Sequence, residues 1–151
     1  MNLQSGAKTS QTMPLPARLL GLAGLIPFVL GALAVSFAPE IKSEAARSLL
    51  VYGAVSLSFL GGIRWGFAML EGQQAGWGTY GLSVAPALVA WLGAVSVGPD
   101  GLLILAVALG LWFLAEQAAP PSLPLPSGYM RLRGGLTAVA VLSLAAAAFA
   151  W

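Results

Sequence analysis

The sequence predicts an all-α integral membrane protein, a bundle of about five transmembrane helices. Of its 151 residues, 58% are hydrophobic and 8% are charged, and the mean hydropathy is +0.86. A soluble domain carries about 25% charged residues, so lipid must cover much of this surface. The charges are also segregated. Three uncharged runs, 19–39, 72–99 and 134–151, approach or exceed the roughly 20 apolar residues that span a bilayer core.

The composition excludes several classes of function. The net charge is +2, and the seven Lys and Arg residues occur singly or in pairs, so nothing in the sequence favours nucleic-acid binding. The chain has no Cys and no His, which removes disulfides, Fe–S ligation and the usual haem, zinc and copper ligands. We therefore expect no cofactor, no metal site and no nucleic-acid partner. We also expect no enzymatic activity, because the serines in the spans have no visible base.

Residues 1–16 are polar and end in Met13-Pro14-Leu15-Pro16, which predicts a flexible N-terminal tail. A five-helix transmembrane domain is expected to follow at 17–151. Its first helix is expected at 17–38, because Pro39-Glu40 stops the apolar run.

A cleaved signal peptide is the alternative for the first helix. Lys8 and Arg18 precede the apolar stretch, and Ala32-Leu33-Ala34 resembles a cleavage site. The uncharged run is longer than the apolar core of a signal peptide, which is roughly 7–15 residues. We therefore expect this helix to be retained.

Four further helices follow, separated by polar or proline-rich segments. Glu71-Gly72-Gln73-Gln74 and Gly98-Pro99-Asp100-Gly101 are turn sequences. The last connection contains Pro120, Pro121, Pro124 and Pro126, which favour an extended, polyproline-like form. The expected helices are 47–70, 79–97, 101–118 and 132–151.

The positive residues predict the orientation, because cytoplasmic loops retain Lys and Arg. An N-terminus on the inside places four cations there and two outside, and Arg64 adds to the inner side if its side chain reaches the headgroups. We therefore predict a cytoplasmic N-terminus and an outside C-terminus. The inner cations are Lys8, Arg18, Arg131 and Arg133, and the outer ones are Lys42 and Arg47.

Two prolines fall inside expected helices. Pro27 lies in the first helix and Pro86 in the third, and each removes a backbone hydrogen bond. We expect a kink at each position. A kink can free carbonyls for a ligand, but more often it only shapes packing.

The second helix carries the most informative segment. Ser58, Gly62 and Gly66 recur every four residues and so share one helix face. Small residues at this spacing let another membrane helix approach closely. We therefore predict that this is a helix-packing face.

Arg64 stands beside that face, at a depth where an unpaired guanidinium is costly. In the predicted topology, Glu116 lies at a comparable depth and Glu71 lies one or two turns beyond. Either carboxylate is a candidate partner, and the alternative is an Arg64 side chain that snorkels to lipid headgroups. With Tyr129 and Arg133, which open the last helix, Arg64 and Glu116 form the predicted functional polar cluster.

These segments resemble the membrane family known as domain of unknown function 3429, which is related to eukaryotic transmembrane protein 69. The resemblance covers most of 18–140 and implies a multi-pass protein of the bacterial or mitochondrial inner membrane, with no established activity. The family commonly has His where Arg64 stands, so a fixed cation replaces a titrating group here. The matching motifs are Gly24-Leu25-Ile26-Pro27-Phe28, Tyr52-Gly53-Ala54, Ser58 through Gly66, Ser83 through Trp91, and Tyr129, Leu132, Arg133, Leu136 and Thr137.

The resulting hypothesis is a small multi-pass protein of the bacterial inner membrane that acts as an accessory or assembly subunit. Its partners would be the lipid bilayer and either a larger membrane complex or further copies of itself. The alternative is a small oligomeric carrier or channel for a small solute or ion, using Arg64 and Glu116.

Overall fold

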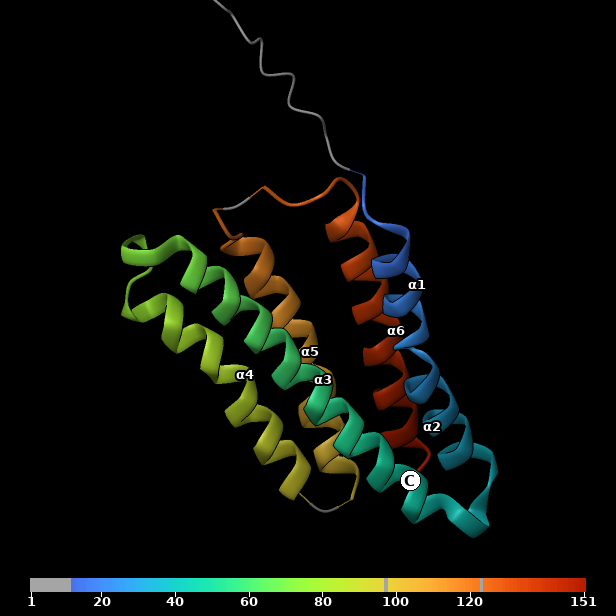
Figure 1. Cartoon of the computed structure of the whole chain (residues 1–151). Helices are drawn as coiled ribbons and strands as arrows, with labels where there is room; N and C mark the ends of the chain where they lie inside the picture. Colours follow the sequence, from blue (N-terminus) through green and yellow to red (C-terminus); the bar gives the residue numbers. More distant parts are fainter. Residues whose placement is uncertain (1–11, 97, 123) are drawn as a thin grey trace, which may run out of the picture.

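The computed structural model describes residues 12–96, 98–122 and 124–151, and these residues form helices joined by short connections (Figure 1). Five helical segments are long and apolar enough to cross a membrane: α1 with α2, then α3, α4, α5 and α6. The predicted all-α class with five spans is thereby confirmed. The helices are α1 (Leu15–Ala23), α2 (Ile26–Phe37), η1 (Pro39–Ile41), α3 (Lys42–Glu71), η2 (Gly72–Gln74), α4 (Trp77–Val95), α5 (Pro99–Ala118) and α6 (Tyr129–Phe149).

Successive spans run in opposite directions, so their connections lie alternately at the two ends of the bundle. Most of the charged residues lie at or near these ends. One end holds the start of α1, the connection between α3 and α4, and the connection between α5 and α6, at the top of Figure 1. We call it the arginine-rich end, after Arg18, Arg64, Arg131 and Arg133. At the opposite end, Lys42 Nζ donates to the main-chain oxygen of Trp151 at 3.1 Å. The residues 1–11, which contain most of the predicted tail, lie outside the described residues.

The observed helix ends differ most from the expected ones at the start of α3. This helix begins at Lys42, five residues before the expected Arg47. The segment from Lys42 to Arg47 is rich in Lys, Glu, Ala and Arg, which are strong helix formers. Hydropathy predicts where the apolar span begins, but residues with high helix propensity extend the helix beyond that point.

The first span is interrupted between α1 and α2, as its proline predicts. Pro27 has no N–H to donate to the carbonyl of Ala23, and the Leu25 N–H bonds the carbonyl of Leu22 at 3.0 Å, three residues back. The Tyr52 hydroxyl of α3 donates to the Gly24 carbonyl at 2.8 Å. A side chain of the next span therefore satisfies a carbonyl that the interruption leaves available.

Pro86 behaves differently, because α4 continues as one helix through it from Trp77 to Val95. Pro86 is buried together with Ser83, and the Ser83 hydroxyl donates to the Tyr80 carbonyl at 2.6 Å. The helix is therefore unbroken at Pro86, and the expected kink there stays a prediction. The ring of Pro86 packs against α3, next to Gly61.

The core is formed mainly by α2, α3, α5 and α6, and α4 covers the outside of α3 and α5 (Figure 1). Leu102, Leu105 and Leu144 are fully buried. These positions tie α5 and α6 to the inner face of α3. The other large buried side chains include Phe28 and Val35 of α2, Leu49 and Leu57 of α3, and Leu109 and Trp112 of α5.

The close approach of α3 to α4 occurs at Gly61. A methyl group on Gly61 would lie 2.5 Å from the carbonyl oxygen of Ser83 and 3.2 Å from Cγ of Pro86. Only glycine allows the two backbones to meet at this distance.

The predicted packing face makes no close contact at its two glycines among the described residues, so its role as a helix interface stays a prediction. Gly62 and Gly66 are exposed, and a methyl group added to either would have no described atom within 4 Å, while Ser58 is half-buried. The Ser58 hydroxyl donates to the Ala54 carbonyl of its own helix at 2.9 Å. The inward face lies one residue earlier, at Gly53, Leu57 and Gly61, because both faces of this helix are apolar and the sequence alone does not fix which one turns inward.

We predict that Gly61→Ala destabilises the bundle and that Gly62→Ala does not. The first methyl group overlaps the α4 backbone, which should cost about 1–3 kcal/mol as overpacking. The second enters open space and improves helix propensity, which should change stability by less than about 1 kcal/mol. Reversible unfolding by SDS in mixed micelles measures both, and equal losses from the two variants would contradict the packing described here.

Candidate functional site

An ion pair between α5 and α6 lies near the arginine-rich end. Arg133 Nη2 is 3.1 Å from Glu116 Oε2, and the two side chains are 10% and 14% exposed. Arg133 is the fifth residue of α6 and Glu116 the third from the end of α5. At a rise of about 1.5 Å per residue, the pair lies within about two turns of these helix ends.

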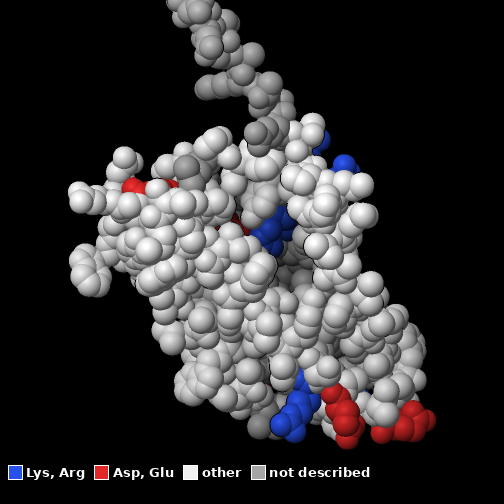
Figure 2. All heavy atoms as spheres, viewed as in Figure 1, with Lys and Arg blue, Asp and Glu red and all other residues white. Residues whose placement is uncertain are grey.

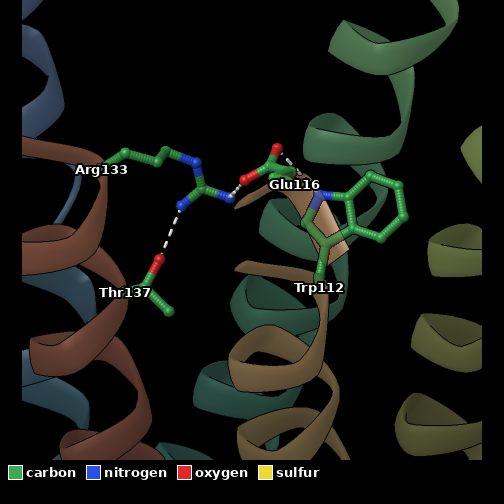
Figure 3. Close-up of polar contacts among 4 residues, drawn as sticks. All are labelled: Trp112, Glu116, Arg133 and Thr137. Atoms are coloured by element: carbon green, nitrogen blue, oxygen red, sulfur yellow. Dashed lines mark hydrogen bonds and ion pairs between the residues drawn. The ribbon is translucent and has the colours of Figure 1, made fainter. Parts of the chain in front are cut away.

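Each charged residue also bonds a side chain one turn along its own helix, as Figure 3 shows. Arg133 Nη1 donates to Thr137 Oγ1 at 2.7 Å, and Trp112 Nε1 donates to Glu116 Oε1 at 3.1 Å. Thr137 and Trp112 were not singled out from the sequence as site residues. Their spacing of four residues from Arg133 and Glu116 is the signal that could have identified them.

The guanidinium is not fully satisfied by these partners. Arg133 Nε and Nη2 are buried and have no hydrogen-bond partner among the described residues. Nη2 lies within ion-pair distance of Glu116 Oε2, but that contact does not have hydrogen-bond geometry. A buried donor without an acceptor costs about 1–3 kcal/mol, and more when the group is charged.

Arg64 has a different partner from either of the expected ones. Its Nη1 donates to the carbonyl oxygen of Ala119, just after the end of α5, where a cation also interacts favourably with the helix dipole. Glu71 Oε1 instead accepts from the Ser122 backbone N–H at 2.9 Å. Arg64 therefore contacts neither candidate carboxylate in the structure, and Arg133 of α6 forms the ion pair with Glu116 instead.

The structure nevertheless brings the predicted polar cluster together. Arg64, Glu116 and Tyr129 line one small cavity of about 20 Å³, and Arg133 reaches the same carboxylate from α6. The functional role of the cluster stays a prediction. The arrangement gathers two guanidinium groups around one carboxylate, so the cluster carries a surplus positive charge.

A hollow adjoins Arg133 on the face between α1 and α3. Two neighbouring cavities, of about 350 Å³ and about 430 Å³, are both lined by Arg133. Figure 2 shows Lys or Arg atoms at the upper edge of a hollow on this face. Across the described ranges, no group of three or more His, Cys, Asp or Glu residues could hold a metal ion.

Comparisons with known proteins identify relatives over nearly the whole chain. A family model described as "Protein of unknown function (DUF3429)" matches residues 13–149. Transmembrane protein 69 of Xenopus tropicalis is 40% identical over 147 residues, covering 94% of this chain and 57% of that protein. Transmembrane protein 69 of Mus musculus is 40% identical over 80 residues, covering 52% of this chain and 33% of that protein.

These matches confirm the resemblance drawn from the sequence motifs. The chain spans a little over half the length of the frog protein and a third of the mouse protein. No solved structure matches.

We predict that Arg133→Met lowers stability by about 3–5 kcal/mol, because it leaves the Glu116 carboxylate buried without a cation. The double variant Arg133→Met/Glu116→Leu should recover most of that loss, since no charge then remains to be compensated. Arg131→Met is the matched control, because Arg131 is exposed on the same turn of α6. SDS unfolding of the four proteins is the measurement. A double variant no more stable than the single one would show that the ion pair is not the source of the effect.

Proposed function

Because the chain belongs to the family described as protein of unknown function DUF3429, its role has to be argued from its own geometry, and we propose that it is an accessory subunit. In this role it packs laterally against the transmembrane helices of a larger membrane complex, or assists the assembly of that complex. Nearly all the described residues lie in the five spans or their short connections. The surface available for recognition is therefore mostly within the membrane.

One observation supports the accessory role above the others: the outer face of α3 has two glycines with no close neighbour among the described residues. This face consists of Ser58, Gly62 and Gly66, and at its end the sulfur of Met69 accepts a hydrogen bond from the Tyr80 hydroxyl of α4 at 3.7 Å. Gly62 and Gly66 have open space around them, and Met69 is 60% exposed. Four-residue spacing of small residues is typical of helices that pack closely in membranes.

A glycine within a helix is destabilising unless a close contact offsets its cost. Each glycine lowers helix stability by about 1 kcal/mol relative to alanine. At Gly61 the close contact with α4 offsets this cost. At Gly62 and Gly66 no contact among the described residues does so, whereas a partner helix laid along this face would.

We also propose that the protein has no catalytic activity. The hydroxyls of Ser36, Ser58 and Ser96 donate to carbonyls four residues earlier in their own helices. A serine held in this way, without a neighbouring base, is not an activated nucleophile.

An oligomeric carrier is the second candidate. It is favoured by the ion pair of Arg133 and Glu116, because ionisable residues within membrane spans commonly mark transport pathways. The charge that would act with Glu116 is then Arg133 and not Arg64. Such a carrier would use the same outer face of α3 to contact a second copy.

Site-specific photo-crosslinking distinguishes these roles. We predict that a photoreactive residue at Gly66, in cells, gives a discrete adduct with another membrane protein. The same residue at Gly135, an exposed glycine of α6 with open space around it, should give none. Gly66→Leu should abolish co-purification of that partner, while Gly135→Leu should not. An adduct only between two copies would instead favour the carrier, and adducts with lipid alone would rule out both.

We also propose that the protein resides in the bacterial inner membrane with its N-terminus in the cytoplasm. The orientation is supported by the excess of arginines at one end of the bundle, since cytoplasmic ends retain Lys and Arg. The chain contains no Cys, so single cysteines report position without background. We predict that, in intact cells, an impermeant thiol reagent labels Ser43→Cys and not Ser127→Cys. The reverse pattern would invert the orientation, and permeabilised cells control for accessibility.

A further inference from the structure

We propose that the hollow between α1, α3 and α6 is a binding site for an anionic amphiphile. The ligand has an acyl chain and an anionic head, either the carboxylate of a fatty acid or the phosphate of a lipid. The acyl chain lies along the apolar wall of the hollow, and the head reaches Arg133. This inference does not depend on the accessory role.

The hollow has the size and lining that an acyl chain requires. Its two cavities, of about 350 Å³ and about 430 Å³, share Phe59, Leu60, Arg133 and Leu136, so they adjoin at Arg133. Ligand pockets are typically about 300–1,000 Å³ and mostly apolar, with a few polar groups that fix orientation. Arg133 and Thr137 are those groups at the inner cavity.

Arg133 has donors that the protein satisfies only in part, because Nη2 has the ion-pair contact with Glu116 and no hydrogen bond, and Nε has neither among the described residues. The residue is 8% exposed, and its Nε and Nη2 have no hydrogen-bond partner among the described residues. The side chain is nevertheless a wall of both cavities. Both atoms are buried, so an anion in the hollow reaches them when the Arg133 side chain turns toward the cavities that it lines, and it then satisfies them in the two-point geometry that arginine favours.

The local charge favours an anion over a neutral head. Glu116 balances the charge of Arg133 through their ion pair. Arg64 lies near the same carboxylate, because Arg64 and Glu116 both line the small cavity. One positive charge therefore remains in excess within the cluster. An anionic head offsets this excess charge and forms hydrogen bonds in which both partners are charged, whereas a head without net charge leaves the excess uncompensated.

The hollow is open to the side, where lipid surrounds the bundle. Leu20 of α1 is 73% exposed, and Val55 and Phe59 of α3 are 60% and 67% exposed, yet all three line the hollow. Figure 1 shows that α1 lies against α6, on the far side of α6 from α4. An amphiphile can thus enter from the membrane without unfolding the bundle.

A second groove provides an internal contrast. It lies between α3, α4 and α5, measures about 550 Å³, and is lined by apolar residues and Trp112, with no charged side chain among the described residues that form it. Its apolar walls suit any lipid chain, but it has no group that selects a head. Val107 lines this groove and Val55 lines the hollow, and both are 60% exposed.

The test is amphiphile binding to the full-length purified protein in a neutral detergent, followed by native mass spectrometry and thermal shift. The probes are oleate, dioleoyl phosphatidylglycerol and dioleoyl phosphatidylcholine. We expect at least one anionic probe to bind about tenfold more tightly than phosphatidylcholine, which corresponds to about 1.4 kcal/mol. Phosphatidylcholine also carries a phosphate, but its choline cation neutralises the head. Preference for phosphatidylglycerol therefore identifies a lipid phosphate with net negative charge, and preference for oleate identifies a carboxylate ligand.

Three variants locate the site. Val55→Phe fills the hollow and should weaken anionic binding about tenfold, whereas Val107→Phe in the second groove should change it less than about twofold. Arg133→Gln/Glu116→Gln removes both charges without leaving one buried alone, and it should abolish the preference for an anionic head. Equal binding of all three probes to the wild type would overturn the proposal, as would equal effects of the two phenylalanine variants.

Discussion

Hydrocarbon offers no hydrogen bonds to a peptide group, and the five spans meet that constraint with helical ladders that bond within the segment. The first span is the instructive case, because Pro27 interrupts its ladder and the Tyr52 hydroxyl bonds the nearby Gly24 carbonyl. The same constraint determines how the helices pack. Without a hydrophobic driving force between helices in lipid, contact depends on shape, and the approach of α3 to α4 depends on the missing side chain of Gly61.

The same lack of polar solvent in hydrocarbon determines how the buried charged residues are arranged. Arg133 and Glu116 are mostly buried, and each remains tolerable because it has the other, together with Thr137 or Trp112, as a neighbour. The ion pair links α5 to α6, which are separated in the sequence by the proline-rich connection. It also leaves guanidinium donors without partners among the described residues, beside an apolar hollow. Structural and binding roles are thus combined in one side chain, so a substitution of Arg133 alone does not separate them.

The sequence was sufficient for the number and the type of the spans, because lipid selects about 20 apolar residues per crossing and tolerates few charges. It did not locate the inward faces. In a soluble helix the polar side marks the surface, but Gly61 and Gly62 lie side by side in α3, where neither of the two faces they belong to is marked by a charged residue. The sequence also grouped Arg64, Glu116, Tyr129 and Arg133, which lie together in the structure, but it offered Arg64 and not Arg133 as the candidate partner of Glu116. Which guanidinium reaches a carboxylate depends on the rotation of each helix, and hydropathy carries no information on rotation.

The lengths of the spans also limit how the bundle can respond to its surroundings. The helices α4, α5 and α6 have 19, 20 and 21 residues, or about 28–32 Å at 1.5 Å per residue. That range matches an average hydrocarbon thickness of about 30 Å, so these helices have little spare length with which to tilt. A thicker, sterol-rich bilayer would have to thin around α4 first. The protein is thereby matched to a membrane of ordinary thickness, and hydrophobic mismatch alone would disfavour its residence in a thicker one.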